Sequence, residues 1–182
     1  MKRAPRHPAF AVPPLLPAHS APPCHRVLGI DPGSVRTGWG VVERKGQAAR
    51  GIAAGVIRVS ERASLAQRLE TIHRGIAQVL AEHKPDAVAI EDIFFARYAQ
   101  AALMLGHARG VALLAAAQAG LAVSAYPPTV VKRAIVGSGK AEKTQVAALV
   151  GALLGLKVLP GIDATDALAI AITHLNASRI GI

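Results

Sequence analysis

Cysteine is almost absent from this 182-residue chain, and other features that would point to particular protein classes are missing too. The single cysteine, Cys24, excludes an intramolecular disulfide and any metal site built from several thiolates. No uninterrupted apolar run reaches the ~18 residues expected of a membrane-spanning helix. Aromatic residues make up only 3% of the chain. These absences favour a reducing, cytoplasmic setting with no membrane partner.

Acidic residues are also scarce. The chain has 11 Asp and Glu against 21 Lys and Arg, which gives a net charge of +10. A small basic domain favours a polyanionic partner, with nucleic acid the first choice and an anionic membrane surface the second. A merely basic, ribosome-like protein would have the same charge. Hydrophobic residues make up 52%, which is enough to build a sizeable core.

Residues 1–25 differ from the rest of the chain. They hold seven of the 12 prolines and no acidic residue, and their prolines interrupt any apolar stretch, which argues against a signal peptide. We predict a disordered, Pro-rich basic extension here, or a start site assigned too far upstream. Residues 26–182 keep 18 Lys and Arg against 11 acids, so the single predicted domain is itself basic at +7.

The pattern of apolar residues and turns predicts an alternating order of elements, β-β-β-α-β-α-β-α. Three strands joined by short turns indicate an antiparallel meander, and the later strands follow helical crossovers. The fold class expected is therefore α/β, with a mixed five-stranded sheet and helices on both faces. The strands are predicted at residues 26–31, 37–43, 51–59, 87–91 and 121–126, and the helices at 64–83, 98–119, 129–136, 142–154 and from 163.

Four carboxylates stand at the ends of apolar elements. Asp31 ends the first strand, Glu91 ends the fourth, and Asp163 and Asp166 open the last helix. A carboxylate beside so much apolar sequence is costly unless something neutralises it. Positions i and i+3 share one helix face, so Asp163 and Asp166 point the same way. If the two strands are neighbours, all four side chains converge.

Such a cluster suits a hard divalent cation. Mg²⁺ takes oxygen ligands, and two ions about 3.5–4 Å apart promote phosphodiester cleavage. We therefore expect Mg²⁺, two ions per active site, with Mn²⁺ able to substitute. Each carboxylate also has a structural alternative: Asp31 as the cap of a Pro-Gly turn, and Asp163 as a helix N-cap with Asp166 favourable to the helix dipole. Glu91 is harder to explain structurally.

Two groups of side chains are candidates for DNA contacts. Phe94 and Phe95 follow Glu91 closely, and one could stack on an unpaired base while the other fills the core; Phe94 is the better stacking candidate. A Gly-rich loop is flanked by cations suited to phosphate. One of them, Lys143, lies in the first turn of a helix, where the dipole disfavours it. The cationic candidates are Lys132, Arg133, Lys140, Lys143 and, beside Asp31, Arg36, which is alternatively only solvated.

Five ordered blocks of this sequence resemble the RuvC family. The match covers residues 26–174, which is nearly the whole domain, and this order makes it more specific than any single motif. The blocks are Gly29-Ile30-Asp31-Pro32-Gly33-Ser34 with Thr37-Gly38-Trp39-Gly40; Ala89-Ile90-Glu91 with Phe94-Phe95-Ala96; the stretch Ala101 to Val111; Val131-Lys132 with Val136-Gly137-Ser138-Gly139 and Ala141 to Val146; and Asp163 to Ala171.

The resemblance implies an RNase H-like fold and a Mg²⁺-dependent homodimer that nicks four-way (Holliday) DNA junctions symmetrically, together with a RuvA–RuvB branch-migration complex. It implies that Asp31, Glu91, Asp163 and Asp166 are the catalytic metal ligands. The chain departs from the family pattern in strand-contact residues rather than at the carboxylates. Arg97-Tyr98 replaces Lys-Asn, with Arg97 a further DNA-binding candidate; Met104 stands at a commonly basic position, and His107 replaces a common Gln.

Three other functions remain as alternatives. Actin-like ATPases and sugar kinases have a similar phosphate-binding turn, but they duplicate the fold, and 182 residues leave no room for a second copy. A different RNase H-like nuclease would act on RNA or an RNA–DNA hybrid. A non-catalytic junction-binding protein would be expected to lack one of the four carboxylates.

Overall fold

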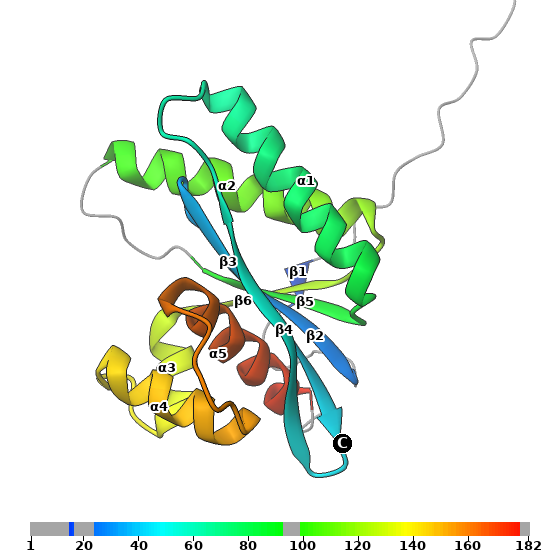
Figure 1. The fold of residues 1–182 in the computed structure, drawn as a ribbon, viewed down its shortest axis with the longest axis vertical. Helices are drawn as coiled ribbons and strands as arrows, with labels where there is room; N and C mark the ends of the chain where they lie inside the picture. The colour runs from blue at the N-terminus through cyan, green and yellow to red at the C-terminus, as the bar shows by residue number, and fades with distance from the viewer. Residues whose placement is uncertain (1–14, 17–23, 93–98, 179–182) are drawn as a thin grey trace, which may run out of the picture.

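A mixed β-sheet forms the centre of the computed structural model, with helices on both of its faces (Figure 1). The structure describes residues 15–16, 24–92 and 99–178. The strand order is β1-β6-β5-β2-β3-β4. The elements are, in chain order, β1 (Leu15–Leu16), β2 (Arg26–Asp31), β3 (Arg36–Lys45), β4 (Ala48–Arg58), α1 (Leu65–His83), β5 (Ala87–Glu91), α2 (Ala99–Gln118), β6 (Val123–Tyr126), α3 (Pro128–Val136), α4 (Lys143–Leu154) and α5 (Ile162–Ala177).

The sheet confirms the predicted mixed topology. β2, β3 and β4 form an antiparallel meander, whereas β5 and β6 run parallel to β2 because α1 and α2 carry the chain back between them. The five predicted strands are all present. A two-residue strand, β1, adds a parallel partner to β6 at the edge. It lies within the predicted extension, most of which is outside the described residues, so the disorder of that extension stays a prediction.

Local sequence signals explain most element boundaries. Ser64 caps α1 in a capping box: its hydroxyl accepts from the backbone N–H of Gln67, and the Gln67 side chain accepts from the N–H of Ser64. β3 and β4 are longer than predicted because a tight turn joins them directly, with Gly46 at φ +60°. Cys24, which was placed in the extension, is 6% exposed and belongs to the core.

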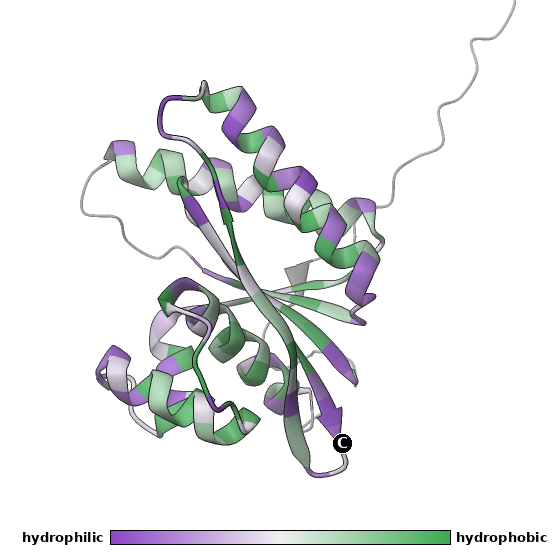
Figure 2. Cartoon of the chain, in the orientation of Figure 1, coloured by the Kyte–Doolittle hydropathy of each residue, from purple (hydrophilic) through white to green (hydrophobic). Residues whose placement is uncertain are grey.

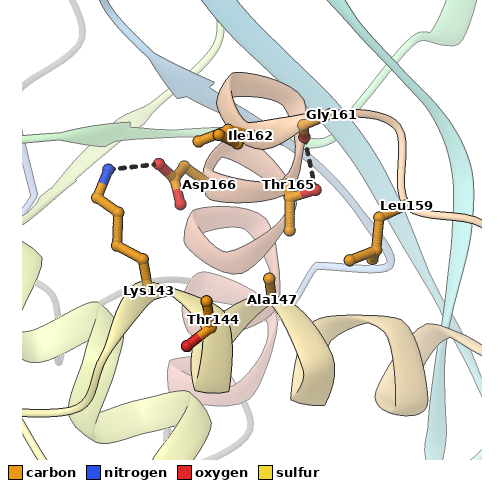
Figure 3. Close-up of a pocket in the computed structure, with 8 residues that line it drawn as sticks. All are labelled: Lys143, Thr144, Ala147, Leu159, Gly161, Ile162, Thr165 and Asp166. Carbon is orange, nitrogen blue, oxygen red and sulfur yellow. Dashed lines mark hydrogen bonds and ion pairs between the residues drawn. The ribbon is translucent and has the colours of Figure 1, made fainter.

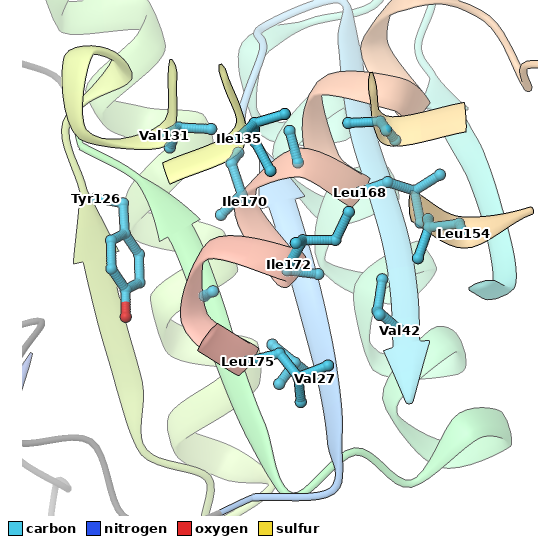
Figure 4. Close-up of a cluster of buried hydrophobic side chains, with 14 of the residues drawn as sticks. Val27, Val42, Tyr126, Val131, Ile135, Leu154, Leu168, Ile170, Ile172 and Leu175 are labelled. Atoms are coloured by element: carbon cyan, nitrogen blue, oxygen red, sulfur yellow. The ribbon is translucent and has the colours of Figure 1, made fainter. Parts of the chain in front are cut away.

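Helices α1 and α2 cover one face of the sheet, and α3, α4 and α5 cover the other (Figure 1). Each interface has its own buried apolar cluster. Figure 2 shows hydrophilic and hydrophobic segments alternating along α1, whereas α5 is mainly hydrophobic. The difference reflects position: α1 has an outer face, but α5 is packed between the sheet and the pair α3 and α4 (Figure 4).

Helix α2 has the length and apolar composition that would also suffice to cross a membrane, by those two criteria alone, and it is the only such helix in the described ranges. In the structure it packs against α1, and four of its alanines are buried in the core between these helices and the sheet. Small side chains allow this close packing. These residues are Ala108, Ala112, Ala115 and Ala116.

Candidate active site

Asp31 and Glu91 end two neighbouring strands at the same edge of the sheet. β2 and β5 are parallel, and Ile30 pairs with Ile90, so the carboxylates that follow lie side by side. Both side chains belong to half-buried residues at the boundary of the core. The condition that the sequence left open, that these two strands are neighbours, is met, and Asp31 and Glu91 lie at the same end of the sheet as expected.

The turn after Asp31 is held by other residues. The Thr37 hydroxyl donates to the carbonyl oxygen of Gly33 at 3.0 Å, and the Arg68 guanidinium donates from Nε to the carbonyl oxygen of Ser34 at 3.1 Å. Thr37 is fully buried. With these bonds in place, the turn has its own stabilising partners, and capping it does not account for the Asp31 carboxylate.

Glycines bring α5 onto the backbone of β2 and β3. A Cβ atom added to Gly29 would lie 2.0 Å from the carbonyl oxygen of Ala167, and one added to Gly38 would lie 2.0 Å from that of Asp163. Only glycine permits so close an approach. Because Gly38 is the register partner of Asp31, this contact carries the start of α5 to the edge where Asp31 and Glu91 lie.

The helix-capping explanation for the two aspartates of α5 is wrong. The N-cap is Gly161, at φ +98°, and it makes no side-chain cap hydrogen bond. Asp163 lies in the first turn, but Asp166 lies beyond it, where the helix dipole no longer offers much stabilisation. Asp166 therefore needs another partner.

The carboxylates act on one another strongly. Burial raises the pKa of Asp31 to about 8, with further contributions from the charges of Glu91 and Asp166. Burial also raises the pKa of Glu91, and the charge of Asp166 adds to it. A cation placed among these groups would relieve their repulsion and favour their charged forms.

Two lysines share the site with these acids. Lys143 Nζ donates to Asp166 Oδ2 at 3.1 Å, and this ion pair raises the pKa of Lys143. A small cleft of about 70 Å³ is lined by Lys132 and Lys143 together with Glu91 and Asp166. The ion pair offsets the unfavourable placement of Lys143 in the first turn of α4. The structure thus brings three of the four predicted acids and two of the predicted cations together.

The donor set fits a hard divalent ion, although it does not form a closed cage. In the parts of the chain that the structure describes, no three acidic, histidine or cysteine side chains form a group ready to hold a metal ion. Mg²⁺ does not need one, because it keeps several waters and is completed by substrate phosphate. Carboxylate oxygens in mutual repulsion, at an edge open to solvent, match that requirement in chemistry and charge.

The other predicted DNA-binding residues fall into two groups. Arg133 and Lys140 are exposed on α3 and on the loop before α4, close to the lysines of the cleft in sequence. Arg36 is exposed at the start of β3 and is not among the residues that line the cleft. Phe94, Phe95 and Arg97, with Tyr98, lie outside the described residues.

Arg109 was not predicted from the sequence as a residue of this site. Arg109 on α2 makes an ion pair with Asp92 at 3.2 Å, and its Nε donates to the backbone carbonyl of Glu91 at 3.3 Å. Its side chain is only 19% exposed. Asp92 could have pointed to such a residue, because a second carboxylate directly after Glu91 needs a cationic partner of its own. Arg109 therefore fixes the end of β5.

Solved structures share the fold of this chain. The structure described as T. thermophilus RuvC in complex with Holliday junction substrate is 41% identical, with a TM-score of 0.81 over 86% of this chain and 97% of that one. The yeast mitochondrial Holliday junction resolvase Ydc2 is 15% identical with a TM-score of 0.65, which is a likeness of fold alone.

Sequence comparison agrees with the structures. The relative from Sorangium cellulosum (strain So ce56) is 53% identical over 84% of this chain and 86% of its own length, and the one from Halorhodospira halophila (strain DSM 244 / SL1) is 52% identical over 83% and 90%. Both are named crossover junction endodeoxyribonuclease RuvC. The model of the family with that description matches residues 27–174. The chain belongs to the RuvC family of crossover junction endodeoxyribonucleases.

Proposed function

We propose that this chain resolves four-way (Holliday) DNA junctions by paired, symmetric hydrolysis of phosphodiester bonds, in recombination and DNA repair. The observation that carries this proposal is the grouping of Asp31, Glu91 and Asp166 with Lys132 and Lys143 at one sheet edge. Acids that favour a divalent ion and cations that favour a phosphate are both needed to cut a nucleic acid. The family assignment supplies the substrate class.

We assign the catalytic, metal-holding role to Asp31, Glu91, Asp163 and Asp166. Their oxygens suit Mg²⁺, two ions per active site, with Mn²⁺ able to substitute. Bound there, the metal would activate the attacking water and stabilise the leaving 3′ oxygen, so that 5′-phosphate and 3′-hydroxyl ends remain. Asp163 and Asp166 share one face of α5, which is held against β2 and β3 by the glycine contacts.

DNA contact is assigned to the cations around the cleft. Lys132 and Lys143 line it, and the exposed Arg133 and Lys140 follow or precede them closely in sequence; all four neutralise backbone phosphates. Arg36 is exposed near Asp31 and takes the same role. For Phe94 and Phe95, base stacking stays a prediction, as does DNA contact by Arg97, because these three lie outside the described residues.

A homodimer completes the proposed function, since paired cuts need two active sites. α2 offers the surface: Leu103 is 61% exposed and Leu114 is 51% exposed. Gly106 and Gly110 lie between them on the exposed side, and a Cβ added to either would have nothing within 4 Å. Leucines flanking two glycines allow close contact between helices. By resemblance, the dimer works in the cytoplasm with a RuvA–RuvB branch-migration complex.

The test is cleavage of a labelled synthetic four-way junction, with Mg²⁺ or with EDTA, beside matched linear duplex and RNA–DNA hybrid. We expect paired symmetric nicks in the junction only, and only with metal. Asp31→Asn should still bind the junction but not cut it, whereas Glu61→Gln, which changes an exposed carboxylate outside the site, should cut normally. Cleavage of the hybrid instead would move the chain to another RNase H-like activity. Binding without cleavage by the parent would leave only a junction-binding protein.

A further inference from the structure

A cavity of about 240 Å³ lies beside Asp166, between α4 and the start of α5 (Figure 3). The roles assigned above leave it without a use. Lys143 and Leu159 stand on opposite sides of it in the view, with α4 below and the first turns of α5 above. Its walls are mostly aliphatic, with a charged pair at one side. The lining residues are Lys143, Thr144, Ala147, Leu159, Gly161, Ile162, Thr165 and Asp166.

Two of the lining side chains are apolar and exposed. Ile162 is 72% exposed and Leu159 is 40% exposed. Scattered exposed apolar residues need no explanation, but these two border the same cavity, and Ile162 directly precedes Asp163. The cavity shares Lys143 and Asp166 with the cleft described above, so this apolar surface lies next to the candidate catalytic residues.

The chemistry of the cavity favours the base of a nucleotide over its phosphate. A phosphate is disfavoured inside, because the walls are aliphatic and Asp166 repels anions. The flat apolar faces of a base suit such walls, and base-handling enzymes hold extruded bases between apolar side chains. The Thr144 hydroxyl can meet a polar atom on the base edge, whereas the Lys143 ammonium is held by Asp166 at 3.1 Å. The Thr165 hydroxyl is already committed, because it donates to the carbonyl of Gly161 at 2.6 Å.

The position of the cavity beside Asp166 also favours a base. For cleavage, the scissile phosphate must reach Asp31, Glu91 and Asp166, and Asp166 is itself a wall of the cavity. A base on a nucleotide next to that phosphate is therefore within reach of the cavity.

We propose that this cavity receives one unstacked nucleobase of the strand being cut, beside the scissile phosphate, and that Ile162 acts as an apolar wedge that keeps this base apart from its neighbours. The proposal rests on the proposed junction-cleaving function and adds a base-binding subsite to it. Bases differ in how readily they unstack and in their polar edges, so this subsite would contribute to the choice of cleavage position.

The test combines protein variants in which a larger side chain fills the cavity with DNA junctions from which one base has been removed. Ala147→Leu fills the cavity from α4, and Thr144→Leu is a second variant in case the first fails to fold. Val158→Ala is the matched control, because Val158 is 83% exposed in the connection between α4 and α5 but does not line the cavity. Each protein is assayed on an intact junction and on junctions with one abasic residue at successive positions around the cut.

We expect Ala147→Leu to cut the intact junction about fivefold or more slowly, the effect of losing one base contact. Junction affinity should change little, because phosphate contacts dominate it. At one abasic position the parent and Ala147→Leu should cut equally fast, because no base remains to be excluded. Val158→Ala should behave as the parent on every junction.

Fluorescence of 2-aminopurine at that position gives a readout that does not need cleavage. With EDTA present, the signal should rise when the parent binds and should not rise with Ile162→Ala. Equal slowing of intact and abasic junctions by Ala147→Leu, or parental cleavage rates on both, would overturn the proposal, and the second result would leave the cavity to a protein side chain. If the parent cuts no junction, the proposed function fails, while the fluorescence still decides whether the cavity takes a base.

Discussion

Asp31 shows how a single side chain in this protein depends on its surroundings. Its pKa is raised to about 8, first by burial and then by the charges of Glu91 and Asp166, while Lys143 opposes the shift. Without a metal, the folded protein therefore holds a proton that the unfolded chain releases at a much lower pH. A bound cation reverses this preference, so binding of metal is expected to release protons.

The first prediction concerns the pH dependence of stability in EDTA. Because the pKa of Asp31 in the folded protein lies above its ordinary value of 3.8, the stabilising contribution of Asp31 is complete below about pH 4 and is lost as the pH rises through about 8. Thermal unfolding should therefore show the melting temperature falling across this window. Asp31→Asn should flatten the fall and be more stable than the parent at high pH. Parallel profiles for the two proteins would contradict the raised pKa.

The second prediction concerns Gly38, which lets α5 approach β3. Gly38→Ala would place a Cβ 2.0 Å from the carbonyl oxygen of Asp163, so α5 must move. We expect a loss of about 1–3 kcal/mol in the free energy of unfolding and a larger loss of cleavage than of junction binding. Gly51→Ala is the control: its Cβ would meet Leu156 at an ordinary 3.4 Å. Equal behaviour of the two variants in denaturant unfolding and cleavage assays would refute the close-approach explanation.

At the scale of elements, Arg109 joins α2 to the end of β5. It holds Asp92 and the backbone of Glu91 at once, so it fixes the direction in which Glu91 leaves the strand. We predict that Arg109→Gln lowers kcat about tenfold or more and raises the Mg²⁺ concentration needed for half-maximal rate, as loss of support around a metal ligand commonly does. KM for the junction should hardly change, because Arg109 makes no predicted DNA contact.

Two further variants distinguish the support that Arg109 gives to Glu91 from a general loss of stability. Arg109→Lys should recover part of the activity, since an ammonium keeps the ion pair with Asp92 but forms no guanidinium fork. Arg74→Gln removes an exposed ion pair with Glu70 on α1 and should leave the Mg²⁺ titration unchanged. A parental Mg²⁺ titration for Arg109→Gln would show that Glu91 does not need this support.

The exposed side of α2 carries the next prediction. Placing glutamates at Leu103 and Leu114 should convert a dimer to a monomer, because like charges would meet across the proposed helix contact. Sedimentation would measure the change, and the junction assay should show that paired nicks are lost. Leu153→Glu on α4, where the side chain is 47% exposed, should leave the dimer intact. A dimer that survives the double substitution would place the interface elsewhere.

At the scale of the whole molecule, the net charge of +10 predicts strongly salt-dependent binding. Lys132→Gln and Lys140→Gln should each reduce the slope of log affinity against log salt by about one, because each removes one phosphate contact. Lys84→Gln changes an exposed lysine just before β5, at the sheet edge opposite Glu91, and should not alter the slope. Fluorescence anisotropy across a salt series measures the slope for all three variants. A shallower slope for Lys84→Gln would mean that the salt dependence follows the net charge of the protein and not the position of the lysine.

Much of the fold was predictable because its signals are local. The predicted five-stranded mixed sheet with helices on both faces is confirmed, and so are membership of the RuvC family and the function class it implies, a Holliday junction resolvase. The capping box at Ser64 and the apolar strands around Ile30 and Ile90 depend on neighbours within a few residues. The β3–β4 hairpin was misjudged in length, because alternation says little about where a tight turn begins.

Part of the site was also predictable, since parallel neighbours present their ends at one edge. That rule placed Asp31 and Glu91 at the same end of the sheet on the condition that their strands are neighbours, and the pairing of β2 with β5 met the condition. The partners of those acids were not predictable: Lys143 is 23 residues from Asp166, and Arg109 reaches β5 from another helix. Contacts of this kind depend on how helices lie across the sheet, which no periodicity encodes.

The amino-acid sequence by itself determined the order of elements, the carboxylates that end β2 and β5 and the one that opens α5, and the positive charge of the domain, because each is a property of neighbouring residues or of composition. Tertiary structure alone decided how close α5 lies to β2 and β3, which it did through Gly29 and Gly38. It also decided that Arg109 supports Glu91 and that a cavity opens beside Asp166. These features need residues far apart in the chain to meet, and packing of the whole molecule sets those distances.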